Sequence, residues 1–352
     1  MKLFFVVLVL ILSLFSFGIK PVFALSCLDE SGKEVDWFVA IKMPILSDES
    51  GFEDGDRYMF IDENHSDWQL SEKRLTAPDN HISRTINQVY DQDIGYVMYN
   101  DEPVDGGEEP RYAHAKGVMA WSSDDRGGFW MPHSVPRFPH PRNGQKYLFP
   151  DPQLDFGQSF FCMSVGWATL GEITTALRHN KVYLIGSARD TGGNPDYMTR
   201  LLSNDYEEDD QLTVTNIETS SRVPLTMFSK SGQWGKDLYD DGVAPEFKSD
   251  LVVETWMRPF IGSVCHGVNA TSAFSVVNSN NVAPPFCEPY HYTKDHSKIA
   301  ISLNPGVAKV CIGDINRNTS QYSRGGGTVC IHNADLWNAF YTVYGADRDR
   351  CK

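Results

Sequence analysis

Residues 295–303 read Asp-His-Ser-Lys-Ile-Ala-Ile-Ser-Leu, which places a His-x-Lys triplet directly before an apolar run. The run predicts a β-strand. Side chains alternate across a strand, so the imidazole and the ammonium group of the triplet lie on one face. Residues 114–121 repeat the arrangement as His-Ala-Lys-Gly-Val-Met-Ala-Trp. The sequence therefore predicts two similar half-sites, each at the head of a strand.

The two triplets are suited to chemistry on a single phosphodiester group. One imidazole attacks phosphorus, the second protonates the departing oxygen, and the lysines neutralise charge on the non-bridging oxygens. Such a reaction requires no metal ion. The catalytic residues expected from this pattern are His114, Lys116, His296 and Lys298.

A third triplet, His179-Asn-Lys181, favours a structural role. Ten histidines and 15 lysines among 352 residues would give about 0.4 such triplets by chance, so spacing alone selects none of the three. Residues 171–178 have a helical pattern, and a histidine at a helix C-terminus interacts favourably with the dipole and the last carbonyls. We expect His179 to end a helix.

Several further motifs, in one order, resemble the deoxyribonuclease II family, the acid DNA endonucleases of lysosomes and animal secretions. The resemblance covers nearly the whole chain from about residue 25 onward. The motifs are Asp-Trp-Phe at 36–38, His-Ala-Lys-Gly at 114–117, Gly-Gly-Phe-Trp at 127–130, His-Ser-Val-Pro at 133–136, Phe-Pro at 138–139, Gly-Gln-Ser at 157–159, Asp-His-Ser-Lys at 295–298 and Cys-Ile-Gly-Asp-Ile-Asn-Arg at 311–317.

The resemblance implies a fold distantly similar to phospholipase D. We expect an α+β (α/β-like) fold in which two mixed sheet and helix halves form a pseudo-twofold arrangement with the active site between them. In phospholipase D each triplet is followed by a glycine-containing motif that bears an amide. Residues 157–159 and 313–316 resemble those motifs, which implies a catalytic role for Asn316 and substrate binding by Gln158 and Ser159.

The chain departs from phospholipase D at two positions. An aspartate stands five positions after each lysine in that family, whereas this chain has Trp121 and Leu303 there. The departure argues against a phospholipid substrate and leaves the nuclease prediction intact.

The family implies an acid, metal-independent endonuclease that cuts double-stranded DNA to 3′-phosphate and 5′-hydroxyl ends through a phosphohistidine intermediate. We assign His114 as the nucleophile and His296 as the acid. We expect no cofactor and no metal, because the sequence has neither EF-hand spacing nor paired CxxC motifs.

Two alternatives stay open. The first is a phosphodiesterase of another substrate class, acting on lipid or RNA through the same pairs. The second is a non-enzymatic secreted glycoprotein that binds nucleic acid on a degenerate copy of the fold. Retention of both histidines and both lysines argues against the second, because a binding protein needs no nucleophile.

The segment 131–142 carries His133, Arg137, His140 and Arg142 among four prolines, close to the first triplet. Prolines fix φ and remove donors, so we expect an ordered loop. In acid the segment would hold up to four positive charges, which makes it a candidate contact for DNA phosphates. We assign His133 and Arg137 to substrate binding, with a purely structural turn as the equal alternative.

The N-terminus predicts export. Residues 1–24 have the features of a secretory signal, with an apolar run at 3–17 and cleavage expected after Ala24. The run is shorter than the roughly 20 residues that span a membrane. We therefore expect a lysosomal or secreted protein without a membrane span. Three glycosylation sequons fit this route and begin at Asn64, Asn269 and Asn318.

Seven cysteines in an exported chain predict disulfides with one cysteine left over, and sequence alone leaves the connectivity open. The family resemblance implies three pairs and leaves Cys287 free or paired between chains. The implied pairs are Cys27 with Cys162, Cys265 with Cys351, and Cys311 with Cys330.

The formal charge of the chain is −15, and it becomes −17 once residues 1–24, with their two lysines, are removed. Phosphate neutralisation supplies much of the affinity for nucleic acid, so this charge opposes DNA binding at neutral pH. In an acidic compartment carboxylates begin to protonate and histidines become cationic, which moves the balance toward neutral.

We expect one fused catalytic unit behind the signal, with an N-terminal half at residues 25–190 and a C-terminal half at 191–352. The triplets are 182 residues apart, which suits one in each half. DNA is the expected partner, and the sequence is compatible with a monomer or a homodimer. Strands are expected at 37–43, 95–99, 117–121, 160–165, 182–185, 252–256, 299–303, 310–315 and 328–331, and helices at 171–178 and 334–344.

Overall fold

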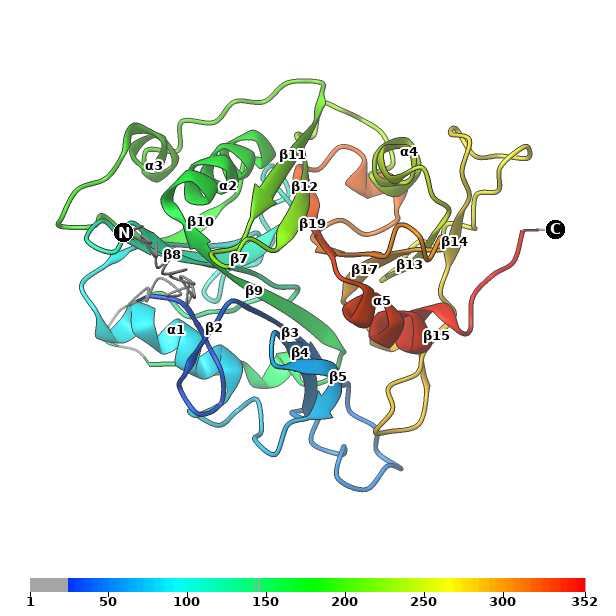
Figure 1. Ribbon diagram of the computed structural model, residues 1–352, viewed down its shortest axis with the longest axis horizontal. Coiled ribbons are helices and arrows are strands. Elements are labelled where there is room, and N and C mark those ends of the chain that lie inside the picture. The colour runs from blue at the N-terminus through cyan, green and yellow to red at the C-terminus, as the bar shows by residue number, and fades with distance from the viewer. Residues whose placement is uncertain (1–24, 143, 145, 352) are drawn as a thin grey trace, which may run out of the picture.

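The structure, a computed structural model, describes residues 25–142, 144 and 146–351. The expected signal peptide at residues 1–24 lies outside the described residues. Most of the regular secondary structure in the described chain is β-sheet, with a few helices (Figure 1), so the fold is α+β, as expected. Among the described residues no helix is long and apolar enough to cross a membrane.

The first large sheet has eight strands in the order β10-β6-β7-β8-β9-β3-β4-β5, and every neighbouring pair is antiparallel. Its strands are β3 (Trp37–Lys42), β4 (Tyr58–Asp62), β5 (His65–Leu70), β6 (Gly95–Asn100), β7 (Lys116–Ser122), β8 (Gly127–Pro132), β9 (Gln158–Gly166) and β10 (Leu184–Ala188).

The second sheet has seven strands in the order β11-β12-β19-β18-β17-β13-β14, antiparallel except for the last pair. Its strands are β11 (Leu212–Glu218), β12 (Pro224–Lys230), β13 (Leu251–Thr255), β14 (Val276–Asn278), β17 (Lys298–Ser302), β18 (Lys309–Gly313) and β19 (Gly326–His332). Two small ribbons pair β1 (Cys27–Leu28) with β2 (Glu34–Val35) and β15 (Asn281–Val282) with β16 (Tyr290–His291).

Within the described residues five α-helices flank the sheets: α1 (His81–Asp91), α2 (Trp167–Asn180), α3 (Asp196–Leu202), α4 (Ala244–Phe247) and α5 (Ala334–Phe340). Short 3-10 turns cover Asp151–Gln153, Tyr292–Lys294 and Thr319–Gln321, and π-helical turns cover Tyr239–Val243 and Tyr341–Gly345. The expected helix at 334–344 is thus divided into α5 and the π-helical turn that follows it. Asn333 caps α5 through a side-chain bond to the Leu336 amide.

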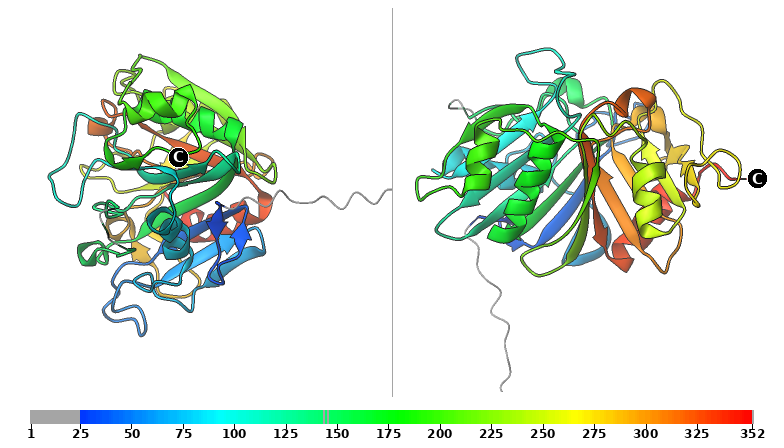
Figure 2. Two further views of the ribbon diagram at one scale, coloured as in Figure 1. Left: turned by 90° about the vertical axis from the view of Figure 1, so that its left-hand side faces the viewer. Right: turned by 90° about the horizontal axis from the view of Figure 1, so that it is seen from above.

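The two sheets share one hydrophobic core, which includes Ala115 of the first triplet and Ile299 directly after the second. Helix α2 contacts β8 and β9 of the first sheet and β11 and β12 of the second, as Figures 1 and 2 show. Helix α5 bridges β5 and β18 in the same way, and β9 touches β18 directly. The core between the sheets includes Val39, Met119, Ile299 and Val329.

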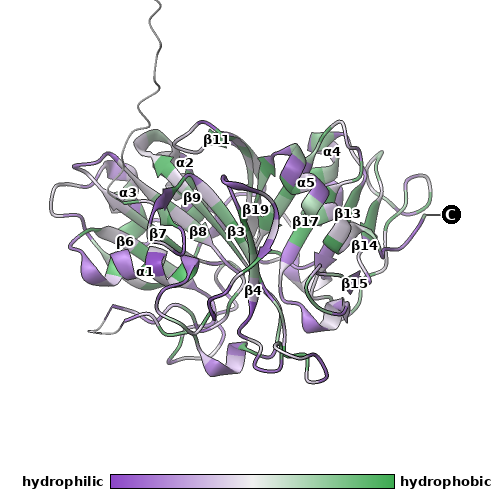
Figure 3. Ribbon diagram, turned by 60° about the horizontal axis from the view of Figure 1, so that its bottom comes forward, coloured by the Kyte–Doolittle hydropathy of each residue, from purple (hydrophilic) through white to green (hydrophobic). Residues whose placement is uncertain are grey.

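Both strands that follow the triplets are buried on both faces, because separate clusters cover the outer sides of the sheets. One cluster lies under α1 on the first sheet and another under α4 on the second. Figure 3 shows the hydrophobic residues concentrated along the central strands and the hydrophilic residues in the surrounding helices and loops. The expected strands at 117–121 and 299–303 correspond to β7 and β17.

Three disulfides fasten the described chain: Cys27–Cys162, Cys265–Cys351 and Cys311–Cys330. These are the pairs that the family resemblance implied. Cys287 has no disulfide partner and is partly exposed. The Cys311–Cys330 bridge joins β18 to β19, the two strands between which the loop carrying Asn316 lies.

Candidate functional site

His114 precedes β7 and is held by backbone of the second sheet. Its backbone N–H donates to Gly325 O at 2.9 Å, and its ring Nδ1 lies 2.6 Å from the backbone oxygen of Asp314. A carbonyl oxygen only accepts, so Nδ1 carries the hydrogen and Nε2 keeps its lone pair. The contact therefore sets the tautomer that a nucleophilic imidazole requires.

His296 precedes β17 and lies between two aromatic rings. The Phe156 ring stacks on it at 4.1 Å between centroids with an angle of 13°, and the Trp256 ring lies 4.7 Å away. The backbone N–H of His296 donates to Gly157 O at 2.9 Å, which ties it to the start of β9 in the first sheet. Its Nε2 is buried without a hydrogen-bond partner among the described residues.

The two lysines are buried beside the histidines. Lys116 is 3% exposed and its Nζ lies 2.5 Å from Asp101 Oδ1 and 3.4 Å from Glu102 Oε1. Lys298 is 5% exposed and donates to the backbone oxygen of His296 at 2.6 Å. Burial, and after it the charge of Lys116, lower the pKa of Lys298 to about 8.

The two triplets form one electrostatic unit. Burial lowers the pKa of His114 well below its ordinary value, and the charges of Lys116 and then Lys298 act in the same direction. Burial, followed by the charges of Lys298 and Lys116, likewise lowers the pKa of His296 to about 3. Each histidine therefore experiences the lysine of the other triplet, and both imidazoles are neutral in the free protein.

Three further residues expected in the site present buried polar atoms. Asn316 follows β18, and its Oδ1 has no hydrogen-bond partner in the part of the chain that the structure describes. At the start of β9, Gln158 Oε1 accepts from Ser134 Oγ at 2.5 Å. Within the same described residues Gln158 Nε2 and Ser159 Oγ are left without partners. Buried polar atoms are normally paired, so these three groups fit a polar ligand or water.

Asp101 neutralises the cations of the first half-site. Its Oδ1 meets Lys116, and its Oδ2 accepts from Arg324 at 2.8 Å. Arg324 also pairs with Glu108 at 2.9 Å. Although burial acts in the opposite direction, Lys116, His114 and Arg324 together hold the pKa of Asp101 well below its usual range.

The donor atoms of Asp101, Glu102 and His114 lie within 4.8 Å of one another, close enough to be considered for a metal ion. Both oxygens of Asp101 are already engaged by Lys116 and Arg324. A cation there would have to displace two cationic side chains, so this donor set does not fit a metal.

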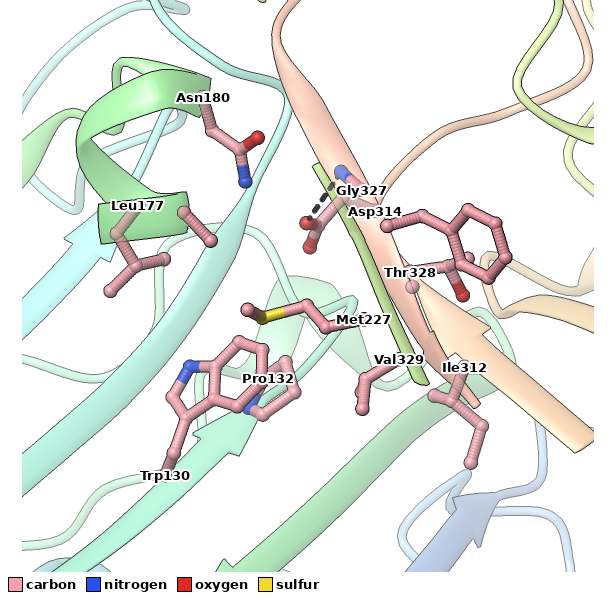
Figure 4. Close-up of a pocket in the computed structure, with 13 residues that line it drawn as sticks. Trp130, Pro132, Leu177, Asn180, Met227, Ile312, Asp314, Gly327, Thr328 and Val329 are labelled. Carbon is pink, nitrogen blue, oxygen red and sulfur yellow. Dashed lines mark hydrogen bonds between the residues drawn. The ribbon is translucent and has the colours of Figure 1, made fainter. Parts of the chain in front are cut away.

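Asp314 follows β18 and lines a small pocket, as Figure 4 shows. Its Oδ2 accepts from the Gly327 amide at 3.3 Å, and it faces a small cavity of about 10 Å³ whose lining includes Asn180 and Trp130. Burial raises the pKa of Asp314 to about 7. Its carboxyl group is therefore largely protonated in acid and adds little negative charge beside His114.

Of the two residues expected to contact DNA outside the triplets, Arg137 is exposed and His133 is buried. Arg137 is exposed, and its backbone N–H donates to Glu102 O at 2.9 Å, close to the first half-site. His133 is 3% exposed and packs against the rings of Phe138 and Phe160. Burial lowers the pKa of His133 well below its ordinary value, so the positive charge expected for it in acid is not supported.

The structure also bears on the expected roles of His179 and of the three glycosylation sequons. His179, in the last turn of α2, bonds Ser229 Oγ through Nδ1 and Asp209 through Nε2, each at 3.0 Å, which agrees with a structural role. A glycan at Asn318 conflicts with the structure, because the side chain is 4% exposed and its Nδ2 donates to Arg258 O. Asn64 and Asn269 are both exposed.

The sequence is similar to known proteins over most of its length. Residues 26–347 match the family model described as Deoxyribonuclease II. A Caenorhabditis elegans protein named deoxyribonuclease-2 is 35% identical over 93% of this chain and 94% of its own length. Plancitoxin-1 of Acanthaster planci is 32% identical over 90% of each chain. Deoxyribonuclease-2-alpha of the mouse is 29% identical over 92% of this chain and 93% of its own.

Proposed function

The chain belongs to the deoxyribonuclease II family and is a nuclease, and from that premise we propose that it is an acid, metal-independent endonuclease. Its substrate is double-stranded DNA, and its products carry 3′-phosphate and 5′-hydroxyl ends. The observation that carries the proposal is the bond from His114 Nδ1 to Asp314 O, because it leaves Nε2 free to attack phosphorus.

In the first step His114 Nε2 forms a bond to phosphorus while the bond from phosphorus to O5′ breaks. His296 gives a proton to O5′, which leaves as the 5′-hydroxyl, and the DNA strand stays attached to His114 as a 3′-phosphohistidine. In the second step water attacks phosphorus and loses a proton to His296. The bond to His114 then breaks and releases the 3′-phosphate end.

Lys116 and Lys298 neutralise the non-bridging oxygens, which gain charge as phosphorus becomes five-coordinate. Asn316 contributes an amide to the same oxygens. Gln158 Nε2 and Ser159 Oγ are donors suited to a phosphoryl or sugar oxygen, which would supply the partners that they lack among the described residues. Arg137 stands on the surface beside the site and contacts a neighbouring phosphate.

The preference for acid follows from the low pKa values of the histidines. At neutral pH both imidazoles are neutral, and no proton is present for the leaving oxygen. The negative charge of a bound phosphate raises both pKa values, so substrate binding draws in the required proton. A lower pH makes this uptake more favourable.

The chain consists of two fused halves, residues 25–190 and 191–352, in a pseudo-twofold arrangement. Support comes from β7 and β17, which follow equivalent triplets and lie inside different sheets. We further propose that residues 1–24 direct the protein to the lysosome or to secretion, with glycans at Asn64 and Asn269.

The proposal is tested with thymidine 3′-(4-nitrophenyl phosphate), whose leaving group departs without a proton. The His296→Ala variant should then form the intermediate but fail to hydrolyse it. We expect a burst of one nitrophenolate per chain and a thymidine 3′-phosphoryl group on the peptide that contains His114, found by mass spectrometry under alkaline conditions.

The matched control is His114→Ala, which should give neither burst nor adduct. An adduct on His296 in that control would reverse the two roles. Turnover of this ester without any adduct in His296→Ala would rule out the covalent mechanism.

A further inference from the structure

A second polar cavity lies away from the two triplets, at the edge of the first sheet formed by β4 and β5. Its volume is about 600 Å³, and it is bounded by the N-terminus of α1 and the turn after β1. Its polar lining includes Asp29, Glu30, Glu34, Asp62, His65 and His81. The cavity shares no lining residue with the candidate nuclease site.

His81 is a buried histidine that lines this cavity. It is 1% exposed, and its Nδ1 lies 3.1 Å from the hydroxyl oxygen of Tyr58. That hydroxyl donates to Glu30 Oε1 at 2.5 Å, so it accepts from His81 Nδ1–H. Nε2 of the neutral ring therefore carries a lone pair.

The lone pair of His81 faces a carboxylate. Nε2 lacks a hydrogen-bond partner within the described residues, and the Asp62 Oδ2 atom is 3.9 Å away. A nitrogen lone pair and a carboxylate oxygen repel each other unless a cation lies between them. This distance is too long for a good hydrogen bond between His81 Nε2 and Asp62 Oδ2. The two atoms therefore share either a poorly aligned proton or a larger cation.

A second imidazole reaches the same carboxylate. Asp62 Oδ1 lies 2.7 Å from Nδ1 of His65, and Asp62 itself is 3% exposed. The rings of His65 and His81 both pack against Phe60, with centroids 5.5 and 4.3 Å from its ring. The side chain of His65 is 43% exposed, so it can turn about its Cα–Cβ bond without moving the core.

We propose that this cavity binds a divalent transition-metal ion of the zinc class through His81 Nε2, the Asp62 carboxylate and the His65 imidazole. Two imidazoles and one carboxylate are donors suited to zinc, whereas calcium and magnesium prefer oxygen donors alone. His65 swings in to complete the site. The excess of carboxylates over the single lysine of the lining, Lys33, attracts a cation.

Protons compete with the metal for the same nitrogens. Burial disfavours the charged form of His81, but the contacts with Asp62 and Glu30 outweigh burial and raise its pKa above the ordinary value. The other titratable groups that face it are Tyr58, His65, Asp29, Glu34 and Glu63. Zinc binding should therefore weaken as pH falls.

The test is isothermal titration of the metal-free, untagged full chain with zinc chloride at about pH 7.5. We expect one high-affinity ion per chain and no comparable binding of calcium. His65→Gln and His81→Gln should each weaken binding at least tenfold, and a shift to about pH 5 should do the same. His332→Gln, which removes an exposed histidine at the end of β19, is the matched control and should bind as the wild type does.

Absence of zinc binding to the wild type would overturn the proposal, as would unchanged affinity in His65→Gln. Circular dichroism checks that each variant is folded. If His81→Gln does not fold, Asp62→Asn and His65→Gln decide the question, and retention of full affinity in both would show that His81 holds a proton only. The readout is binding, so it is independent of the proposed reaction.

Discussion

His114 donates a hydrogen bond from Nδ1 to the backbone oxygen of Asp314 at 2.6 Å, although 200 positions separate the two residues in the chain. The first triplet is thus oriented by the backbone directly after β18, and the second is tied through His296 to Gly157, directly before β9. Each half-site depends on backbone from the other sheet, so neither is complete without the whole chain.

We predict that His114 is an Nδ1–H tautomer in the free protein at neutral pH. Nuclear magnetic resonance of the protein labelled with nitrogen-15 in histidine distinguishes the two ring nitrogens, and the signal that disappears in His114→Gln identifies the residue. An Nε2–H signal for His114 would contradict the assignment of this residue as the nucleophile.

Asp101→Asn should lower the free energy of unfolding by about 3–5 kcal/mol, because it leaves two buried cations, Lys116 and Arg324, without their shared anion. The pKa of Asp101 is depressed in the folded state, so its contribution is present above the ordinary pKa of about 4 and is lost only below it. Denaturant unfolding should give similar losses at about pH 5 and pH 7.

Asp91→Asn, an exposed position at the end of α1, is the control for Asp101→Asn and should change stability little. Equal stability of the two variants would show that the cluster around Lys116 is not the buried ionic network described here.

The pH dependence of kcat/KM and of kcat should differ. His296, the acid, has a pKa lowered to about 3 in the free protein by burial and the neighbouring lysines. Its protonated fraction, and with it kcat/KM, should rise about tenfold for each unit by which pH falls from about 7 to 4. Burial and the charges of Lys116 and Lys298 also lower the pKa of His114, which favours the neutral, nucleophilic form of its ring.

Bound phosphate raises the pKa of His296, so kcat should reach its maximum at a higher pH than kcat/KM. Steady-state rates with a short duplex at constant ionic strength give both profiles. If the two curves coincide, phosphate does not supply the proton uptake that the mechanism needs.

Asn316→Ala should lower kcat by about 10²-fold while KM changes little, because its amide stabilises oxygens that gain charge only in the transition state. Asn338→Ala, an exposed position on α5, is the matched control and should retain activity. A large rise in KM with unchanged kcat would place Asn316 in ground-state binding instead.

Local sequence patterns predicted the strands that follow the two triplets. The apolar runs after the two triplets form β7 and β17, since alternation and burial are local properties of a strand. The helical spacing of apolar residues in 334–344 predicted α5 for the same reason. Asp314 stood within a motif of the resemblance, but nothing in that motif indicated that its backbone oxygen would orient His114.

Contacts between distant segments were not predictable from the sequence. The stacking of Phe156 on His296 joins residues 140 positions apart, and the bond from Arg324 to Asp101 spans 223 positions. His133 was assigned to substrate binding because its segment is rich in cations, with a structural turn as the equal alternative. Its ring instead packs beside Phe160, because the pairing of β8 with β9 continues through a bridge between His133 and Phe160.

The central claim is that the two triplets form one metal-independent catalytic unit. The most direct measurement is the rate of supercoiled plasmid cleavage at about pH 5 in excess chelator by the wild type, His114→Ala, His296→Ala and the double variant. We predict full wild-type activity, a loss of several orders of magnitude in each single variant, and little further loss in the double variant, because members of one unit are not additive. A wild type that is inactive in chelator and restored by magnesium, or a folded single variant with full activity, would contradict the account.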